Sequence, residues 1–246
     1  MTIRRIRAVM QHLDLTLSSA AANLACDEAL LDACDNGAGA EVLRFWEPRE
    51  CFVVAGYANE LAREVNLAAC RQAGLGVFRR CSGGGAVLQG PGCLDYSLAL
   101  KMEGRPALAT ITGANRHIME RQRAALASLL GREVEVKGCT DLAAGGLKFS
   151  GNAQRRKRHA LLFHGTFLLR FDLGLMDQFL PMPSRQPDYR QGRGHGRFLT
   201  NLGVEAAAVK AALRLAWEAR APLPEAPDCR RLIEEKYGQD DWNLRF

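Results

Sequence analysis

Three consecutive glycines, Gly83 to Gly85, stand between two short segments that are predicted to be β-strands. Glycine has no Cβ atom, so this run lets the backbone take positive φ angles and approach a ligand closely. No G-x-x-x-x-G-K-[ST] pattern of a P-loop occurs, and the G-x-G-x-x-G pattern of dinucleotide-binding folds is missing as well. A bulge or a loose hairpin turn is the plain alternative. The run therefore predicts a loop that holds a ligand against its main chain.

Hydrophobic periodicity predicts helices interspersed with strands along the whole chain. Helices are expected at 19–34, 65–73, about 118–129, 209–216 and 228–237, and strands at 42–46, 51–55, 77–80, 94–100, 134–136, 148–153 and 160–169. Asp27 and Glu28 in the first helix are expected to face outward or to cap a neighbour. This mixture predicts an α+β (mixed α/β) fold. Since no interdomain linker is evident, residues 1–246 are expected to form a single domain.

The segment from Pro181 to Leu199 is rich in Pro, Gly and Arg and shows no sustained period. Segments of this length without regular structure are uncommon inside a domain and are often functional. We expect a surface loop that orders around a ligand.

Composition narrows the choice of partners. The formal net charge of +6 suits an acidic protein partner or a nucleotide, but aromatic residues are only 7% and no dense basic stripe occurs, so nucleic acid is not expected. No apolar stretch is long enough to span a membrane, and the first ten residues have no apolar region of a signal peptide. A cytoplasmic protein is expected. The eight cysteines include no C-x-x-C pair, which predicts reduced thiols and no metal site.

Lys148 is the strongest candidate for catalysis, because it is set among apolar and small residues. An ammonium group keeps little hydration there and interacts strongly with an anionic ligand or transition state, such as an acyl phosphate. A lysine that extends from a strand into solvent is the alternative. His164-Gly165-Thr166 lies in an apolar strand, where buried polar groups need hydrogen-bond partners. We place His164 in the wall of the site and give it no acid–base work.

Several arginines lie close to these motifs in the sequence. Arg79 and Arg80 alternate along a predicted strand, so one of them is expected to point into the cleft and the other outward. The basic run 155–158 lies between two predicted strands and is either a solvated hairpin tip or a patch that docks an acidic carrier domain.

Taken together, six segments in this order resemble the lipoate-protein ligase A family, including its octanoyltransferase relatives. They are Asn23 to Leu31, Gly56 to Asn66, Arg80 to Val87, Thr140-Asp141-Leu142, Lys148 to Ala153, and His164-Gly165-Thr166. The resemblance implies a biotin/lipoate ligase-like catalytic domain with mixed β-sheets flanked by helices. The wording of the Lys148 motif is closer to the lipoate branch than to the biotin branch.

The resemblance also implies roles for individual residues. The glycine loop lines the acyl-chain tunnel in that family, Lys148 contacts the acyl carbonyl and phosphate as the catalytic residue, and the loop holding Thr140 and Asp141 covers the nucleotide. The implied acyl-substrate contacts are Arg80, Ser82, Gly83, Gly84, Gly85, Ala86, Lys148, Gly151, His164, Gly165 and Thr166. The implied nucleotide contacts are Gly85, Val87, Thr140, Asp141 and Lys148.

A ligase of this family activates lipoate with ATP and Mg²⁺, which gives lipoyl-AMP and pyrophosphate. A lysine of a lipoyl-accepting carrier domain then attacks the adenylate. The sequence contains no match to the accessory C-terminal domain of two-domain ligases, so such a ligase is expected to need a separate small partner protein. Departures from the family pattern are Gln89 where many members have His, Cys93 where Asn is common, and Cys139-Thr140 in place of Arg-Asn before Asp141.

These departures leave two alternatives open. One is an ATP-independent octanoyl or lipoyl transferase that carries the acyl group as a thioester on Cys139, activated by its proximity to Lys148. The other is a non-catalytic acyl-binding adaptor built on the same fold. We favour the ligase.

Overall fold

Two β-sheets form the frame of the protein, for which a computed structural model describes residues 10–246. The N-terminal stretch 1–9, on which the expectation of no signal peptide mainly falls, lies outside the described residues. The large sheet has the strand order β11 (Ala221–Pro222), β1 (Gln11–Asp14), β2 (Val42–Trp46), β6 (Cys93–Lys101), β10 (Ala160–Leu168), β9 (Leu147–Arg156), β8 (Asp141–Ala144) and β7 (Glu135–Lys137). The small sheet has the order β4 (Gly76–Arg79), β3 (Phe52–Ala55) and β5 (Val87–Gln89).

Both sheets mix parallel and antiparallel pairs. In the large sheet β1 runs parallel to β2 and β11, whereas the pairs from β2 through β6, β10, β9 and β8 to β7 are antiparallel. In the small sheet β3 is parallel to β4 and antiparallel to β5. The expected mixed α/β fold with sheets flanked by helices is confirmed.

Three longer helices cover the large sheet: α1 (Ala20–Asp35), α4 (Ile111–Leu130) and α7 (Ala206–Ala216). The short helical segments are α2 (Leu61–Glu64), α3 (Leu67–Gln72), η1 (Pro106–Leu108), η2 (Leu173–Leu175), α5 (Met176–Phe179), η3 (Asp188–Arg190), α6 (His195–Phe198), α8 (Arg230–Leu232), η4 (Ile233–Tyr237) and α9 (Asp240–Asn243). Ser19 begins α1 as an N-cap, because its side chain accepts a hydrogen bond from the Ala22 N–H.

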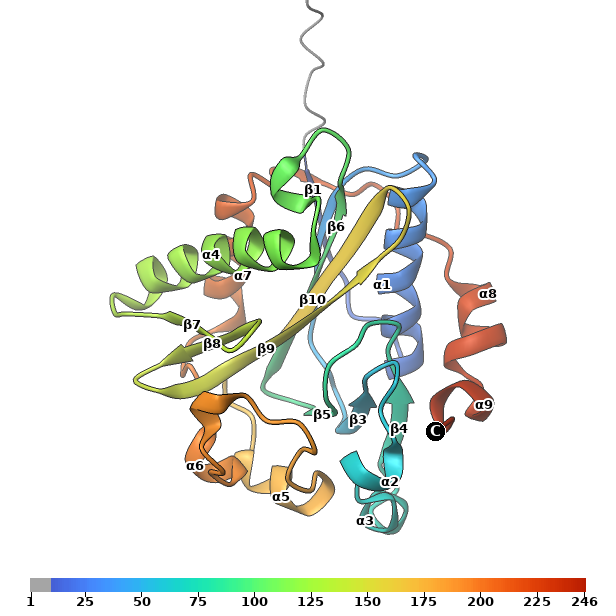
Figure 1. The fold of residues 1–246 in the computed structure, drawn as a ribbon. Helices are drawn as coiled ribbons and strands as arrows, with labels where there is room; N and C mark the ends of the chain where they lie inside the picture. Colours follow the sequence, from blue (N-terminus) through green and yellow to red (C-terminus); the bar gives the residue numbers. More distant parts are fainter. Residues whose placement is uncertain (1–9) are drawn as a thin grey trace, which may run out of the picture.

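The two faces of the large sheet have different covers: α4 and α7 lie against one face, which is called the back face here, and α1 and the small sheet lie on the other side, called the front face (Figure 1). On the back face, α4 and α7 pack on alternate strand residues such as Leu98, Phe163 and Phe149, which form the main hydrophobic core. On the front face lie α1 and the small sheet, with a separate core that contains Cys26 and Leu162. Because successive strand side chains point to opposite faces, the remaining strand residues project toward α1 and the glycine loop.

The predicted α1, β2, β6 and β10 are confirmed within one or two residues, whereas α7 begins three residues earlier than expected, at Ala206, and α4 about seven residues earlier, at Ile111. The last predicted helix begins two residues later than expected, at Arg230, and Asp228 accepts a hydrogen bond from the Arg230 N–H. Four strands escaped prediction: β1, β5, β8 and β11 have only two to four residues each. Such short strands are too brief to show a period.

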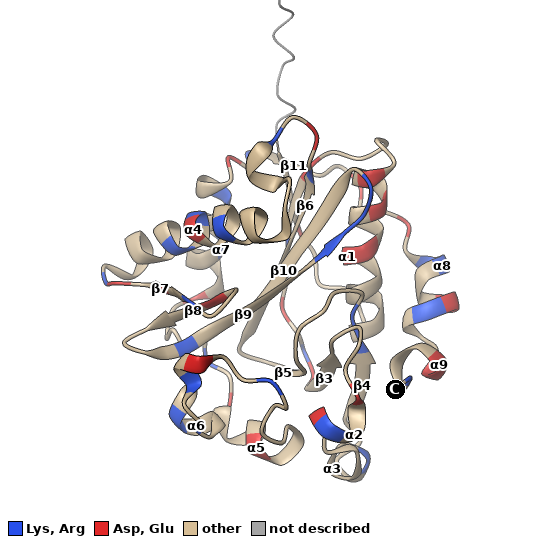
Figure 2. Ribbon diagram, in the orientation of Figure 1, with Lys and Arg blue, Asp and Glu red and all other residues tan. Residues whose placement is uncertain are grey.

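Lys and Arg lie together at the tip of the β9–β10 hairpin, and Asp and Glu lie in the nearby part of α1 (Figure 2). The run 155–158 does form the tip of the β9–β10 hairpin, as one of the two expectations had it, next to the acidic end of α1. Much of its charge is engaged within the chain, because Lys157 pairs with Asp32 and Arg156 donates to the carbonyls of Leu108 and Ala109. Within residues 10–246, no helix is long and apolar enough to cross a membrane.

Candidate active site

Two rows of side chains cross the front face of the large sheet. The first row consists of Arg44, Ser97, His164 and Ala153, and the second of Trp46, Asp95, Thr166, Gly151 and Asp141. Residues of one row are directly paired on neighbouring strands, where side chains come within contact distance. The rows therefore bring together sequence-predicted residues that are up to 25 positions apart, and the glycine loop lies over them.

Lys148 lies at the Asp141 end of the second row. Its Nζ is 2.8 Å from Asp141 Oδ1, and the two side chains are 25% and 14% exposed, so the amine is partly shielded and held in place by a carboxylate. A Cβ atom on Gly151 would lie 2.9 Å from Nζ and 3.0 Å from Cε. The amine can occupy this position only because Gly151 has no side chain.

The glycine loop reaches the same strand two residues further on. A Cβ on Gly84 would be 3.8 Å from the Cβ of Ala153, and Gly84 has a φ of +93° that disfavours other residues. Residues two apart on a strand face the same side and are about 6.6 Å apart. The Lys148 amine above Gly151 and the loop above Ala153 are therefore neighbours on one surface.

Arg80 shapes the glycine loop from within. Its guanidinium donates to the carbonyls of Gly83 and Gly85, to Ser82 Oγ and to Val54 O, and burial lowers its pKa to about 10. Because Arg80 bonds to the loop carbonyls, it leaves the loop N–H groups free. The glycines 83–85 are exposed, and within residues 10–246 none of their N–H groups has a partner. They can therefore donate to an anionic or carbonyl ligand.

Arg79 holds the neighbouring loop in the same manner. It is fully buried, and its guanidinium donates to the carbonyls of Gly56, Tyr57 and Asn59 and to Arg245 O. A Cβ on Gly56 would lie only 2.1 Å from the Gly84 carbonyl oxygen, so the two loops touch through bare main chain. The expectation that one of Arg79 and Arg80 points outward is wrong. Both are buried because each donates hydrogen bonds to a cluster of main-chain carbonyls.

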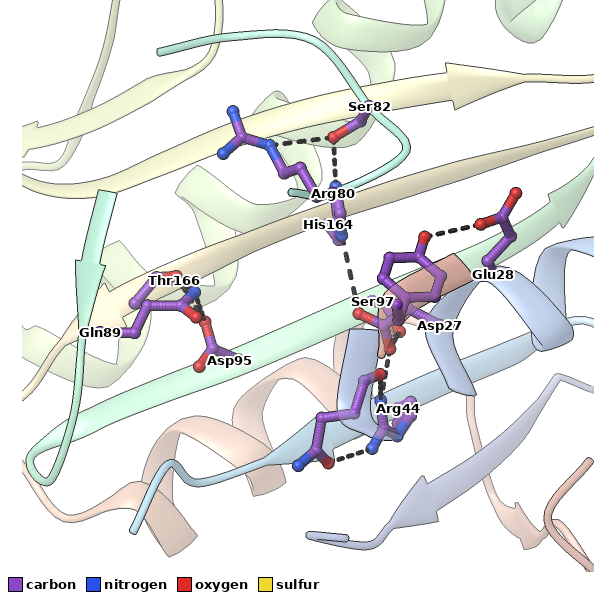
Figure 3. A network of polar contacts seen from close by, with 12 residues as sticks. Asp27, Glu28, Arg44, Arg80, Ser82, Gln89, Asp95, Ser97, His164 and Thr166 are labelled. Carbon is purple, nitrogen blue, oxygen red and sulfur yellow. Dashed lines mark hydrogen bonds and ion pairs between the residues drawn. The ribbon is translucent and has the colours of Figure 1, made fainter. Parts of the chain in front are cut away.

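A chain of polar contacts links the loop to α1 (Figure 3). Ser82 Oγ is 2.5 Å from His164 Nε2, and His164 Nδ1 is 3.6 Å from Asp27 Oδ2. Asp27 Oδ1 accepts a hydrogen bond of 2.6 Å from the fully buried Arg44 and another from Ser97 Oγ. Burial alone would raise the pKa of Asp27, but Arg44 and His164 outweigh it, so this pKa is lowered. His164 thus lies on the front face and is hydrogen-bonded to the loop, while its place in the wall of a substrate site stays a prediction.

A second buried polar cluster surrounds Asp95 (Figure 3). Gln89 Nε2 donates to Asp95 Oδ1 at 2.6 Å and to Thr166 Oγ1 at 2.7 Å, and Thr166 Oγ1 also donates to Asp95. Asp95 Oδ2 and Gln89 Oε1 are buried and have no hydrogen-bond partner among residues 10–246. Burial raises the pKa of Asp95 well above its ordinary value, although the hydrogen bond from Thr166 opposes the shift. Thr166 is therefore engaged with these two side chains.

Asn152 on β9 is contacted by Thr140 and lies next to Gly165 of β10. The Asn152 amide donates to Thr140 O, and Thr140 Oγ1 donates to Asn152 O at 2.6 Å. A Cβ on Gly165 would lie 1.9 Å from Asn152 Oδ1. Gly165 therefore does not share the front face with His164 and Thr166, and we assign it the role of making room for Asn152 instead of contacting substrate.

Other predicted residues lie at the margins. Ala86 and Val87 follow the loop into β5 and pack in the cores beneath it. Cys139 is exposed in the turn between β7 and β8, and its thiol has no hydrogen-bond partner within residues 10–246. Within residues 10–246, no group of three His, Cys, Asp or Glu side chains is placed to hold a metal ion.

Comparisons with known proteins agree with this arrangement. The family model described as the lipoyl protein ligase A/B catalytic domain matches residues 19–212, which contain α1, the small sheet, the large sheet apart from β1 and β11, and both polar rows. The chain belongs to this family. The match includes the glycine loop, Lys148 and the strand that carries His164.

Two curated relatives bear different names. A protein of Aeropyrum pernix named after lipoate-protein ligase A is 34% identical over 152 residues, which are 61% of this chain and 54% of that relative. Octanoyltransferase LipM of Carboxydothermus hydrogenoformans is 27% identical over 258 residues, which cover 93% of this chain and 96% of the relative. The lipoyl ligase and octanoyltransferase branches are thus both represented, and the chain spans about half the length of the first relative.

A solved structure shares the fold. The bipartite lipoate protein ligase of Thermoplasma acidophilum, described together with its E2 lipoyl domain, superposes with a TM-score of 0.80 at 24% identity, over 96% of each chain. This chain is therefore an enzyme-family member with the lipoate ligase fold.

The sequence alone did not reveal several buried polar residues of the site. Asp27 and Glu28 were expected to face outward or to cap a neighbour, but they are 3% and 8% exposed, and Glu28 accepts hydrogen bonds from Tyr237 and Lys236. The available signal was the apolar character of α1 on all sides. A helix of that kind is buried, and its acidic side chains then need partners.

Proposed function

We propose that this protein is a lipoate-protein ligase that activates lipoate with ATP and transfers the lipoyl group to a lysine of a carrier domain. The observation that carries the proposal is the placement of the Lys148 amine, held by Asp141 above Gly151 and beside the exposed N–H groups of the glycine loop. A cation and free N–H donors on one surface stabilise negative charge on an acyl carboxylate or a phosphate.

The chemistry follows from the charges of these groups. A lipoate carboxylate replaces Asp141 at Lys148, and its oxygen attacks the α-phosphorus of ATP, which forms a C–O–P anhydride and releases pyrophosphate. The carrier lysine amine then attacks the acyl carbon, the C–O bond of the anhydride breaks, and AMP leaves with the electron pair. Lys148 stabilises the charge that develops on oxygen in both steps. The carrier amine loses its proton to solvent or to the departing phosphate.

Asp141 is the candidate carboxylate for Mg²⁺. Magnesium bound with a nucleotide is usually held by one or two carboxylates together with phosphates and water, so it does not need a larger protein cluster. Asp141 begins β8, and its carboxylate becomes available when an anion takes its place at Lys148. The donor set present here fits such a substrate-bound ion.

An ATP-independent transferase is the second candidate. It is favoured by the octanoyltransferase relative, which matches over nearly its whole length, whereas the ligase relative matches over about half. Against Cys139 as its nucleophile stands the environment of the thiol: no base or other polar group in the described chain contacts it. A nucleophilic thiol normally has an adjacent base or cation.

Intact-mass measurement of a lipoyl-accepting domain tests the proposal. The protein is incubated with this domain and lipoate, with and without ATP and Mg²⁺, and pyrophosphate is measured in parallel. A candidate small partner is added in a second series, because the solved relative is bipartite. The ligase proposal expects a mass gain of one lipoyl group that requires ATP and is unchanged in Cys139→Ala.

Three other outcomes would contradict the ligase. Transfer from an octanoyl carrier without ATP, lost in Cys139→Ala, identifies the thioester route. The same transfer retained in Cys139→Ala identifies a transferase that uses another group. Tight binding of lipoate without any acylation, even with the partner present, identifies an adaptor.

A further inference from the structure

The segment from Pro181 to Leu199, expected to be an irregular loop, has a defined structure that touches the candidate catalytic lysine. It contains the short helices η3 and α6 and otherwise lacks regular structure. The Tyr189 hydroxyl donates to Asp141 Oδ2 at 2.8 Å, while Asp141 Oδ1 is 2.8 Å from Lys148 Nζ. One carboxylate therefore bridges the phenol of the segment and the amine of β9.

Tyr189 is fixed in this position by its neighbours. Its ring packs against the buried ring of Phe198, with 5.1 Å between the centroids. The guanidinium groups of Arg190 and Arg193 lie 4.6 and 5.3 Å from the Phe198 centroid. Arg193 also donates to Tyr189 O and to Gly146 O in the turn before β9. The phenol thus approaches Asp141 from a preorganised turn and not from a freely moving side chain.

The segment is also attached to the main chain of Lys148 itself. Thr200 N–H donates to Lys148 O at 2.9 Å, and Leu199 forms a β-bridge with Lys148. Lys148 is therefore contacted twice by one segment, through its backbone and, by way of Asp141, through its amine.

We propose that Tyr189 is a positioning residue, which holds Asp141 so that the Lys148 amine stays above Gly151 and so couples the segment 181–199 to the amine. This inference rests on the proposed function of Lys148. An ionised carboxylate only accepts hydrogen bonds, and the phenol supplies a donor on the side away from Lys148. Burial and the nearby Asp141 raise the pKa of Tyr189, which keeps its hydroxyl protonated. When an anionic substrate takes Lys148, the phenol remains as the partner of the carboxylate.

Two variants separate this role from simple support of the segment. Tyr189→Phe removes only the hydroxyl that meets Asp141. Ser184→Ala is the matched control: its hydroxyl ties the same segment to Glu64 on α2 and does not contact Asp141 or Lys148. Acylation of the carrier domain is measured for both, alone and in an Asp141→Ala background.

The proposal expects Tyr189→Phe to lower kcat about tenfold with KM for lipoate within about twofold, and Ser184→Ala to leave both constants nearly unchanged. In the Asp141→Ala background, Tyr189→Phe should change kcat by less than about twofold, because the two residues act through one contact. Equal losses in Tyr189→Phe and Ser184→Ala, or an undiminished loss without Asp141, would overturn it.

A second measurement does not depend on turnover and separates a failure of this inference from a failure of the proposed function. Trypsin cleavage after the exposed Arg185 and Arg197 is followed by mass spectrometry. Lys148→Met, which leaves Asp141 without its cation, should accelerate this cleavage in the Tyr189 protein but not in Tyr189→Phe. Equal acceleration in both backgrounds contradicts the coupling, whether or not the wild-type protein acylates a carrier.

Discussion

A Cβ atom on Gly151 would lie 2.9 Å from the Nζ of Lys148, although the two residues are three positions apart on one strand. The β-bulge that shifts the β8–β9 register between Leu142 and Ala143 accompanies this approach. A bulge changes the direction of side chains along a strand. Here it brings the lysine side chain back over Gly151 and next to Asp141.

Gly151→Ala should therefore damage catalysis more than folding. The atoms that an added methyl group meets are the flexible end of Lys148, which can move aside at little energetic cost. The displaced amine no longer lies above β9, so we expect kcat for carrier acylation to fall at least about tenfold. Steady-state kinetics and a thermal melt of the same preparation check this.

Gly165→Ala serves as the opposite case. Its Cβ would lie 1.9 Å from Asn152 Oδ1 and 2.6 Å from the backbone oxygen of Gly151, which cannot move aside alone. We expect a loss of about 1–3 kcal/mol in the free energy of unfolding. A Gly165→Ala protein as stable as wild type, or a Gly151→Ala protein with full activity, would contradict the steric account.

The two buried aspartates should give stability profiles of opposite slope. The pKa of Asp95 is raised above its unfolded value near 4, so the folded state loses stability as pH rises from about 4 toward the raised pKa. Asp95→Asn removes this loss. We expect it to gain about 1–3 kcal/mol relative to wild type at about pH 8, and less at about pH 5. Urea unfolding at the two pH values measures the difference.

Asp27→Asn is expected to behave in the reverse manner. The pKa of Asp27 is lowered, so its contribution is present above the unfolded pKa and is lost as pH falls through the folded pKa. Removing this charge leaves Arg44 buried without its partner, and we expect a loss of about 3–5 kcal/mol at neutral pH. The same slope for both variants would mean that the ionisation states are assigned wrongly.

Gly56→Ala and Gly83→Ala separate two roles of glycine near the loop: packing against the neighbouring loop, and leaving room for a ligand. A Cβ on Gly56 would be 2.1 Å from Gly84 O, so Gly56→Ala must displace the glycine loop. We expect lower thermal stability together with weaker lipoate binding. A Cβ on Gly83 meets nothing within 4 Å, so Gly83→Ala should melt like wild type and weaken binding only if the acyl group lies against this loop. Calorimetric titration with lipoate compares the two.

Sequence patterns predicted the parts of the site that lie in one contiguous motif. The glycine run and the Lys148 strand were found in this way, since local chemistry marks both. The partners that come from distant segments were not found: Arg44, Asp95 and Tyr189 meet the site through strand pairing and loop packing over long sequence separations. A single sequence does not reveal the register in which strands pair. A shift of one residue in that register would place these side chains on the other face of the sheet.

The prediction that either Arg79 or Arg80 points outward was wrong for a related reason. Strand alternation predicts opposite directions, but it does not reveal that both directions lead into clusters of loop carbonyls. Gly165 shows the same limit, because its paired neighbour on β9, Asn152, decides its role.

The most direct test of the central claim is the rate of lipoyl transfer to a carrier domain by Lys148→Met, compared with Lys157→Met. Lys157 is a matched control in the turn between β9 and β10, at the other end of β9 from Lys148, where it pairs with Asp32. We predict that Lys148→Met lowers the rate about 100-fold or more while its thermal melt stays close to wild type, and that Lys157→Met keeps nearly full activity. A folded Lys148→Met protein that transfers the lipoyl group at the wild-type rate would contradict the account.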